Sequence, residues 1–482
     1  MADPARTSPP PSTPHAESAA PGPQVNVTVI LATLLLAGLS FALLQTMVAP
    51  AIPAIQTALG ASTSATTWVL TGFLVSASVC TPIVGKLGDL YGKGRVLFVV
   101  LLVFAAGSVV AALADSIEVL IAARLVQGVA GGVFPLSFGI IRDTFPPAKI
   151  PLGIGIVSAT FGIGGGLGLA LSGVIVDNVG TRWLFLVGLL AVPAAFVALR
   201  SIPASPTRER TRIDWPGAAL LSLGLAALLI GVSRANDWGW TAGRTLALMV
   251  GGVVVLAGWV AFELRVHEPL VEMRVLRRRP VLLTNLVGLL VGFAMFSSFL
   301  LVPLFVQAPE ATGYGFGASV TEAGLYMVPS ALVMLVAGPL AGGLAGRFGA
   351  RATLIVGCVF TTLSFVFLAF LHESVLHIVI SSALVGVGIA FALSSMANLV
   401  VNSVDQRDVG IATGINTIMR TVGGGFGATI AVAIVTAHTI GASPVPAEAG
   451  FTETFFVAAG VGLLAVLAAI AIPVARPVPG RA

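Results

Sequence analysis

The sequence predicts an all-α polytopic membrane protein, built as two six-helix halves with two further helices inserted between them. Three observations predict this fold class: a very low content of charge, a series of long apolar runs and an internal repeat. Of the 482 residues, 57% are hydrophobic and only 9% are charged, whereas a soluble domain carries about 25% charged residues. So little charge cannot cover a water-exposed surface, which excludes a soluble enzyme, a disordered chain and a nucleic-acid-binding protein.

Fourteen apolar runs are long enough to cross a bilayer, since about 18 or more apolar residues span its hydrocarbon core as a helix. Strands of a membrane barrel would be about ten residues long and would alternate in polarity, and these runs do neither. In chain order the predicted spans are 27–50, 65–86, 95–114, 117–141, 149–176, 181–199, 215–233, 244–264, 281–307, 321–344, 351–371, 374–402, 408–438 and 454–475.

Lysine and arginine are distributed unevenly over the connections between the spans. With the N-terminus inside, 20 of the 25 Lys and Arg residues, Arg407 among them, fall on the cytoplasmic side and only three on the outer side. The remaining two, Arg124 and Arg420, lie within spans. Because positively charged loops stay in the cytoplasm, this distribution predicts that both termini are cytoplasmic and that the protein lies in the cell membrane.

Two glycine patterns recur at nearly one offset along the chain. The first has an offset of 257 and relates Gly85, Leu87 and Gly92 to Gly342, Leu344 and Gly349. The second has an offset of 259 and relates Gly155, Gly164 and Gly168 to Gly414, Gly423 and Gly427. This repeat places the first six spans opposite the last six, and two like-oriented halves with a site between them are typical of transporters. A duplicated bundle that serves only as a scaffold is the alternative.

The repeat divides the chain into segments. The N-terminal half covers residues 27–200 and the C-terminal half covers 281–475, with cytoplasmic linkers and two inserted helices in 201–280. Residues 1–26 are rich in Pro, Ser and Ala and lack an apolar block, so we expect a disordered cytoplasmic tail rather than a signal peptide. Residues 476–482 form a second cytoplasmic tail.

Two short motifs resemble signatures of a known family. The segment from Gly85 to Arg95 resembles the cytoplasmic signature of the major facilitator superfamily, and Arg124 with Gln127 and Gly128 resembles its second signature. The helix count is similar to that of its drug:proton antiporter branch, which has fourteen spans. The resemblance implies the major-facilitator fold, alternating access by rocking of the halves, and a proton gradient as the energy source with no cofactor.

The first motif predicts a cytoplasmic gate. Gly85 and Gly92 permit a tight turn and a close approach of helices. Asp89 can accept hydrogen bonds from a helix N-terminus or pair with Lys93 or Arg95. A charge network of this kind can hold two halves together and break when they rock. The alternative is a short turn whose basic residues only fix the topology.

The glycines of the fifth span resemble a third signature of the family, which marks antiporters. Gly164 and Gly168 lie one turn apart on one face, so a partner helix can pack closely there, whereas Gly155 lies about half a turn away. Leu169 stands where the family has a proline. Tight packing and a hinge are both open as roles for these glycines.

A small set of polar residues lies inside the predicted spans. An arginine in the membrane costs roughly 3 kcal/mol, so a functional role is the default expectation for Arg124 and Arg420. The family resemblance links Arg124 to proton coupling, while Arg420 has Phe161 as its repeat partner and belongs to the second half alone. We predict a role in proton coupling or in a substrate cavity for Gln45, Arg124, Gln127, Asn285, Asn398, Asn416 and Arg420.

Gln45 is the most informative departure from the family pattern, which usually has an aspartate there. Glutamine cannot carry a proton, and the acidic residues all fall in loops or in the outermost turns of the predicted helices. Two embedded arginines without embedded acids favour a neutral or anionic substrate.

The sequence therefore predicts a membrane transporter rather than an enzyme. The leading hypothesis is a proton-coupled exporter of small, mostly hydrophobic compounds, of the multidrug efflux type. The alternative is an exporter of a neutral or anionic natural product with atypical or no proton coupling. The five histidines and two cysteines show no metal spacing. The expected partners are the lipid bilayer and a small-molecule substrate, with no nucleic acid, and one chain is expected to function as a monomer.

Overall fold

The computed structural model describes residues 26–61, 63–203, 214–267, 269–405, 408–440 and 445–473. Regular structure in this part of the chain is helical, apart from one isolated bridge between Thr439 and Pro446. Residues 1–25 of the predicted N-terminal tail, the tail 476–482 and Arg407 lie outside the described residues.

Fourteen helical segments of the described chain are long and apolar enough to cross a membrane, which confirms the predicted number. The first six spans are formed by α1 (Val27–Met47), α3 (Thr63–Tyr91), α4 (Lys93–Ala112), α5 with η1 and α6 (Ile117–Gln127, Gly128–Gly132, Val133–Thr144), η2 with α7 (Pro147–Lys149, Ile150–Val179), and α8 with η3 and α9 (Arg182–Leu186, Val187–Leu190, Ala191–Ser201). The other eight are α10 (Trp215–Ser233), α12 (Gly243–Glu263), α14 (Arg279–Gln307), α15 (Val320–Phe348), α16 (Ala350–Phe370), α17 (Val375–Ser403), α18 (Val409–Ala437) and α19 (Glu448–Ile470). Short connecting helices are α2 (Ile52–Leu59), α11 (Ala235–Trp238), α13 (Met273–Leu276) and η4 (Glu310–Thr312).

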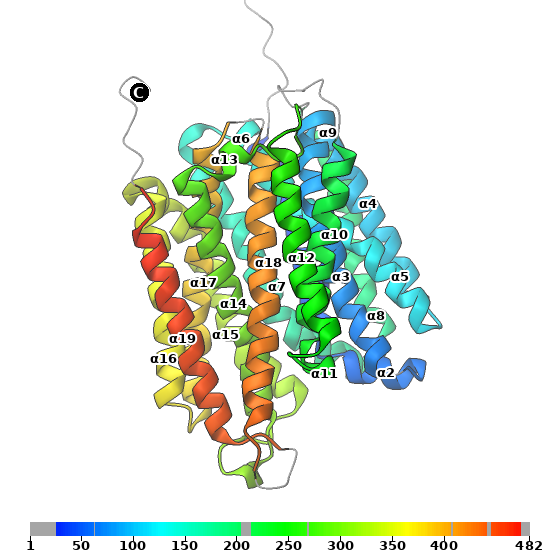
Figure 1. Cartoon of the computed structure of the whole chain (residues 1–482), viewed down its shortest axis with the longest axis vertical. Helices are drawn as coiled ribbons and strands as arrows, with labels where there is room; N and C mark the ends of the chain where they lie inside the picture. The colour runs from blue at the N-terminus through cyan, green and yellow to red at the C-terminus, as the bar shows by residue number, and fades with distance from the viewer. Residues whose placement is uncertain are drawn as a thin grey trace, which may run out of the picture.

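The long helices run side by side, with α6, α9 and α13 at one end of the bundle and α2 and α11 at the other (Figure 1). The end with α13 is the one predicted to face the cytoplasm, and we call it the inner end; the opposite end is the outer end. The orientation in the membrane stays a prediction.

The predicted turn between the second and third spans is much shorter than expected. Gly85 lies inside α3, which continues to Tyr91, and α4 begins at Lys93. Only Gly92 breaks the helix, with a φ of 98° that a residue with a side chain rarely adopts. The repeat-related connection has the same form, because Gly349, with a φ of 89°, alone separates α15 from α16. Gly85 therefore does not form a turn, and its role is the close approach of two helices.

The bounds of other predicted spans differ by a few residues from those of the observed helices. The fourth span is interrupted by the 3₁₀ segment Gly128–Gly132, whose glycines are poor helix formers. The last span was expected at 454–475, but α19 begins at Glu448 and ends at Ile470, shortly before Pro473, which cannot continue a helix.

We call the helices of the first six spans, α1 to α9, the first group, and those of the last six spans, α14 to α19, the second group. The repeated glycines form matching contacts in these two groups of helices. Gly164 and Gly168 of α7 pack against α1, and a Cβ on Gly164 would lie 2.7 Å from the Ala42 carbonyl carbon. Gly423 and Gly427 of α18 pack in the same way against α14. The close approach of these helix pairs therefore depends on the absence of side chains.

The first glycine of each set faces the other group of helices. A Cβ on Gly155 would lie 2.5 Å from the Gly338 oxygen of α15, and one on Gly414 would lie 3.4 Å from a Thr81 methyl of α3. This explains why Gly155 is half a turn away from Gly164 and Gly168: one side of α7 contacts α1 and another contacts α15.

The inserted helices lie at the side of the bundle. α10 packs on α12, α3 and α18, through a small apolar cluster that includes Leu225, Trp259 and Ile418. α12 contacts α10 and α11 and leaves residues such as Val250 and Val254 about 60% exposed. An exposed apolar face of this kind suits contact with lipid.

Candidate functional site

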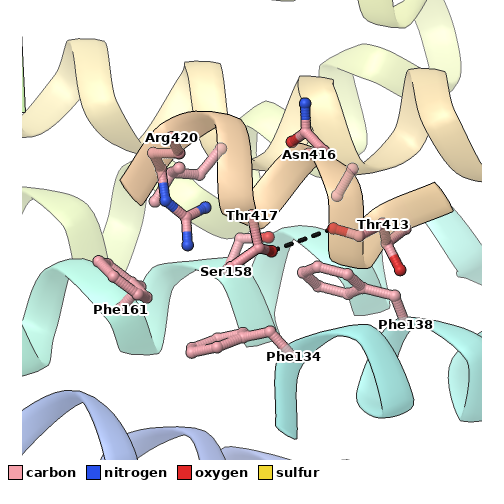
Figure 2. Close-up of a pocket in the computed structure, with 10 residues that line it drawn as sticks. Phe134, Phe138, Ser158, Phe161, Thr413, Asn416, Thr417 and Arg420 are labelled. Carbon is pink, nitrogen blue, oxygen red and sulfur yellow. Dashed lines mark hydrogen bonds between the residues drawn. The ribbon is translucent and has the colours of Figure 1, made fainter. Parts of the chain in front are cut away.

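A narrow cavity lies between α6 and α7 on one side and α17 and α18 on the other (Figure 2). Its volume of about 10 Å³ leaves room for about one water molecule. Three phenylalanine rings and three hydroxyl side chains contribute to its wall. The lining residues are Phe134, Phe138, Ser158, Phe161, Leu393, Ala397, Thr413, Asn416, Thr417 and Arg420.

Arg420 carries the only charge among the cavity-lining residues of the described chain. Figure 2 shows its guanidinium extending from α18 toward Phe161 on α7, and its Cζ lies over the Phe161 ring, 4.4 Å from the centroid. Arg420 is only 8% exposed, yet within the described residues it donates no hydrogen bond and pairs with no carboxylate. Phe161 is also its repeat partner, so two positions related by the repeat meet at the cavity.

Polar groups on α18 and α7 surround the same space. Thr417 donates a hydrogen bond to the Thr413 carbonyl oxygen, 3.1 Å away (Figure 2). Asn416 donates to the side-chain oxygen of Asn285 on α14 at 3.1 Å, which brings together two of the predicted residues. The Ser158 hydroxyl is buried without a hydrogen-bond partner among the described residues. The cavity therefore contains one guanidinium and one hydroxyl that are free to bind a ligand.

Arg124 is the centre of a separate buried network. It is fully buried, and it donates hydrogen bonds to the Val69 carbonyl oxygen at 3.0 Å and to the Gln127 side-chain oxygen at 2.8 Å. Gln127 in turn donates to the Ser108 hydroxyl at 3.0 Å. Arg124 thus ties α5 to α3 and, through Gln127, to α4, and it does not line the cavity.

A row of four phenylalanine rings connects the two arginines. Arg124 lies over Phe73, 4.0 Å from its centroid, at one end of the row, and Arg420 lies over Phe161 at the other. The centroid spacings between successive rings are 5.8 Å from Phe73 to Phe41, 6.0 Å from Phe41 to Phe134, and 5.3 Å from Phe134 to Phe161. These spacings are within the range of favourable aromatic pairs.

The inner end holds a buried ion cluster that includes two predicted gate residues. The Lys93 ammonium lies 3.3 Å from Asp89 and 3.0 Å from Asp143, and each of the three side chains is at most 4% exposed. Arg95 is exposed and takes no part in an ion pair among the described residues, so Lys93 is the one of the two predicted partners with which Asp89 pairs. Asp143 was not predicted, because nothing in the sequence distinguishes it from other acids at span ends.

Backbones of α3 and α18 come very close beside this cluster. A Cβ on Gly85 would lie 2.8 Å from the Gly410 oxygen, and one on Gly410 would lie 3.0 Å from an Asp89 oxygen. The Asp89 carboxylate therefore sits at the N-terminus of α18, where the helix dipole favours a negative charge.

Further contacts join the two groups of helices at both ends. At the inner end, Arg142 of α6 donates to the Val404 carbonyl oxygen at 2.8 Å, and Asn398 of α17 donates weakly to that of Pro151 at 3.5 Å. At the outer end, Thr321 of α15 donates to Asp177 of α7 at 3.3 Å. These contacts join the two groups of helices at both ends, and Asn398 belongs to the inner contact rather than to the cavity wall.

The predicted residues lie in four places: the cavity, the Arg124 network, the inner contact that holds Asn398, and α1. Asn416 and Arg420 line the cavity, Asn285 accepts a hydrogen bond from Asn416, and Arg124 and Gln127 form the separate network. Gln45 is partly buried on α1, and its side-chain oxygen has no hydrogen-bond partner among the described residues.

Comparison with known proteins supports a single family. Residues 34–314 and 306–482 match a family model described as Major Facilitator Superfamily. The chain is 30% identical to a tetracenomycin C resistance and export protein of Streptomyces glaucescens, over 83% of this chain and 74% of that protein. It is 29% identical to a probable actinorhodin transporter of Streptomyces coelicolor (85% and 72% covered) and 26% identical to the multidrug transporter protein MdtP of Bacillus subtilis (87% and 77%).

Among solved structures, the chain is similar to the human organic anion transporter MFSD10. The TM-score is 0.64 at 19% identity, with 93% of this chain and all of that chain covered. At this identity the likeness concerns the fold.

Proposed function

The chain belongs to the major facilitator superfamily, and on this premise we propose that it exports small, mostly hydrophobic compounds by alternating access. The family and the transporter-named relatives identify a multi-pass membrane transporter with the major-facilitator fold rather than an enzyme. The outward direction is supported by relatives named for antibiotic export and multidrug transport. We further propose a plasma-membrane location with both termini in the cytoplasm.

The observation that carries this proposal is the position of the cavity. Its wall is supplied by α6 and α7 from the first group of helices and by α17 and α18 from the second. A site shared by two groups can be exposed to either side of the membrane when they rock against each other. Each chain contributes both walls, so a monomer is sufficient for transport.

The contacts at the two ends supply the proposed gates. The α3 to α18 approach at Gly85, together with the Arg142 bond to Val404, closes the inner end. The Thr321 bond to Asp177 closes the outer end. In an inward-open state we expect the inner contacts to separate, and in an outward-open state the outer ones.

Proton coupling is the proposed energy source, and the family resemblance associates it with Arg124. Two observations favour a second candidate function. Position 45 holds a glutamine in place of an acid, and the cavity-lining residues of the described chain include no carboxylate. In that candidate, export of a neutral or anionic compound proceeds without ordinary proton exchange.

A proton-flux assay separates the two candidates. Inside-out vesicles with a dye that reports ΔpH are exposed to cationic, neutral and anionic compounds, for the wild type, Gln45→Asp and Arg124→Ala. If a compound dissipates ΔpH in the wild type and Arg124→Ala abolishes this, export is proton-coupled without an acid at position 45. If only Gln45→Asp gives a coupled response to cations, ordinary drug:proton exchange is absent from the natural chain. Accumulation of each compound in the same vesicles is measured alongside ΔpH, and if no compound accumulates in any vesicle, the export proposal is wrong.

A further inference from the structure

We propose that the cavity binds the carboxylate or phenolate oxygen of an aromatic anion, and that the Arg420 guanidinium is its ligand. This inference rests on the proposed export function and specifies its substrate class. It begins from the state of Arg420, which is more than nine-tenths buried, borders the cavity and donates no hydrogen bond within the described residues. A buried charge without a partner is costly, so a partner supplied by the substrate is the simplest explanation of its position.

The ring beneath Arg420 leaves its donors free. Contact between a guanidinium and an aromatic face uses no hydrogen-bond acceptor, so the five N–H groups remain available. Phe161 thus holds the side chain at 4.4 Å without competing for a ligand oxygen. A planar guanidinium with free donors matches a carboxylate, which it can bind through two parallel hydrogen bonds.

The rest of the wall selects for an aromatic scaffold. Phe134 lies 5.3 Å from Phe161 and 6.1 Å from Phe138, centroid to centroid, so three rings face one space. The Ser158 hydroxyl, which has no partner among the described residues, can donate to a second oxygen of the ligand. Because the cavity now holds only about one water, the phenylalanine side chains must move apart to admit a ligand of this size.

A negative charge also gives the substrate a driving force for export. An inside-negative potential of about 100 mV favours the outward movement of a monoanion by a factor of about fifty. An anion exporter therefore does not need a membrane-embedded carboxylate, which agrees with Gln45 on α1 and with the uncharged wall around Arg420.

The test uses 9-anthracenecarboxylate and its neutral analogue 9-anthracenecarboxamide as probes. Binding of each to the purified full-length protein in nanodiscs is measured by fluorescence, for the wild type, Arg420→Gln, Arg420→Lys and the control Thr421→Val. Thr421 is the next residue on α18 and does not line the cavity. Size-exclusion elution checks that each variant is folded, and comparing one probe across variants cancels its partition into lipid.

We expect Arg420→Gln to weaken binding of the carboxylate by about 10- to 100-fold and Arg420→Lys by less, because charge-assisted hydrogen bonds have this strength. Binding of the carboxamide should change less than about twofold, and Thr421→Val should match the wild type. Equal carboxylate binding by the wild type and Arg420→Gln overturns the proposal, as does a wild type that does not prefer the acid over the amide or binds neither probe.

A second experiment measures transport of the two probes in proteoliposomes, and it distinguishes failure of this inference from failure of the proposed function. If proteoliposomes move the carboxamide but show no Arg420-dependent preference for the acid, export stands and the anion site is wrong. If the acid binds through Arg420 but neither probe crosses the membrane, the anion site stands and export is wrong.

Discussion

Two buried arginines, one in each group of helices, have opposite surroundings. Arg124 is completely buried and donates hydrogen bonds to Val69 and Gln127, whereas Arg420 borders the cavity and donates none among the described residues. Both lie over a phenylalanine ring at nearly the same distance, 4.0 Å and 4.4 Å. Two charges that are both buried can therefore differ in whether their hydrogen-bond donors are already satisfied, and the number of hydrogen bonds that each makes inside the protein distinguishes them.

The largest expected effect that separates the two arginines is on stability. Arg124→Ala removes two charge-assisted hydrogen bonds, and we expect the free energy of unfolding to fall by about 4 kcal/mol. Arg420→Ala removes a contact with a ring, which corresponds to about 1 kcal/mol, but it also removes the cost of burying a charge without a partner, so we expect the stability of this variant to stay close to that of the wild type or to exceed it. Thermal unfolding midpoints of the two variants and the wild type, measured in one detergent, provide the comparison. Equal unfolding midpoints for the two variants would show that the hydrogen bonds made by Arg124 do not contribute to the free energy of unfolding.

Lys93 extends the comparison to a third buried cation. It resembles Arg124 in having its partners inside the protein, so we expect Lys93→Met to destabilise by about 3 kcal/mol, because Asp89 and Asp143 are left buried without a cation. Adding Asp89→Asn and Asp143→Asn to the same chain should restore most of the loss. The measurement is again the thermal unfolding midpoint, and a triple variant no more stable than Lys93→Met would contradict this account of the cluster.

Substitution of the two rings beneath the arginines should give the smallest effects, and the change in affinity should be confined to the ring beneath Arg420. Phe161→Leu removes the buried ring under Arg420, and we expect affinity for 9-anthracenecarboxylate to fall about two- to fivefold and stability to fall by about 1 kcal/mol. Phe73→Leu removes the ring under Arg124 and should cost about 1 kcal/mol of stability without changing that affinity. Fluorescence binding and thermal unfolding of both variants test whether the affinity alone separates them. Loss of affinity in both variants would mean that the row of rings acts as one unit.

Much of the fold could be predicted from the sequence because the membrane imposes simple rules. The fourteen spans follow from apolar length, and the internal repeat relates α1, α3 and α7 to α14, α15 and α18. Helical periodicity also predicts on which side of α7 each glycine lies. Gly164 and Gly168 pack against α1, and Gly155 packs against α15.

The candidate site was only partly predictable. Arg420, Asn416 and Asn285 stand out as polar residues in apolar spans, but the phenylalanines of the cavity cannot be distinguished from the other rings among the 26 in the chain. Arg142 lies at the end of a span, where a topology-fixing role explains it equally well. Of the two partners of Arg124, Gln127 could be predicted from its position one turn away on the same helix, but the backbone oxygen of Val69 could not, because every residue has such an oxygen.

The most direct test of the difference between the two arginines is to locate a bound anion. Crystals of the full-length protein grown with 10-bromo-9-anthracenecarboxylate would allow the bromine to be placed by anomalous scattering. We predict that the ring system lies between Phe134 and Phe161, with its carboxylate within hydrogen-bond distance of Arg420 and the Arg124 network unchanged. An anion bound to Arg124, or one bound elsewhere while Arg420 stays without a partner, would contradict it.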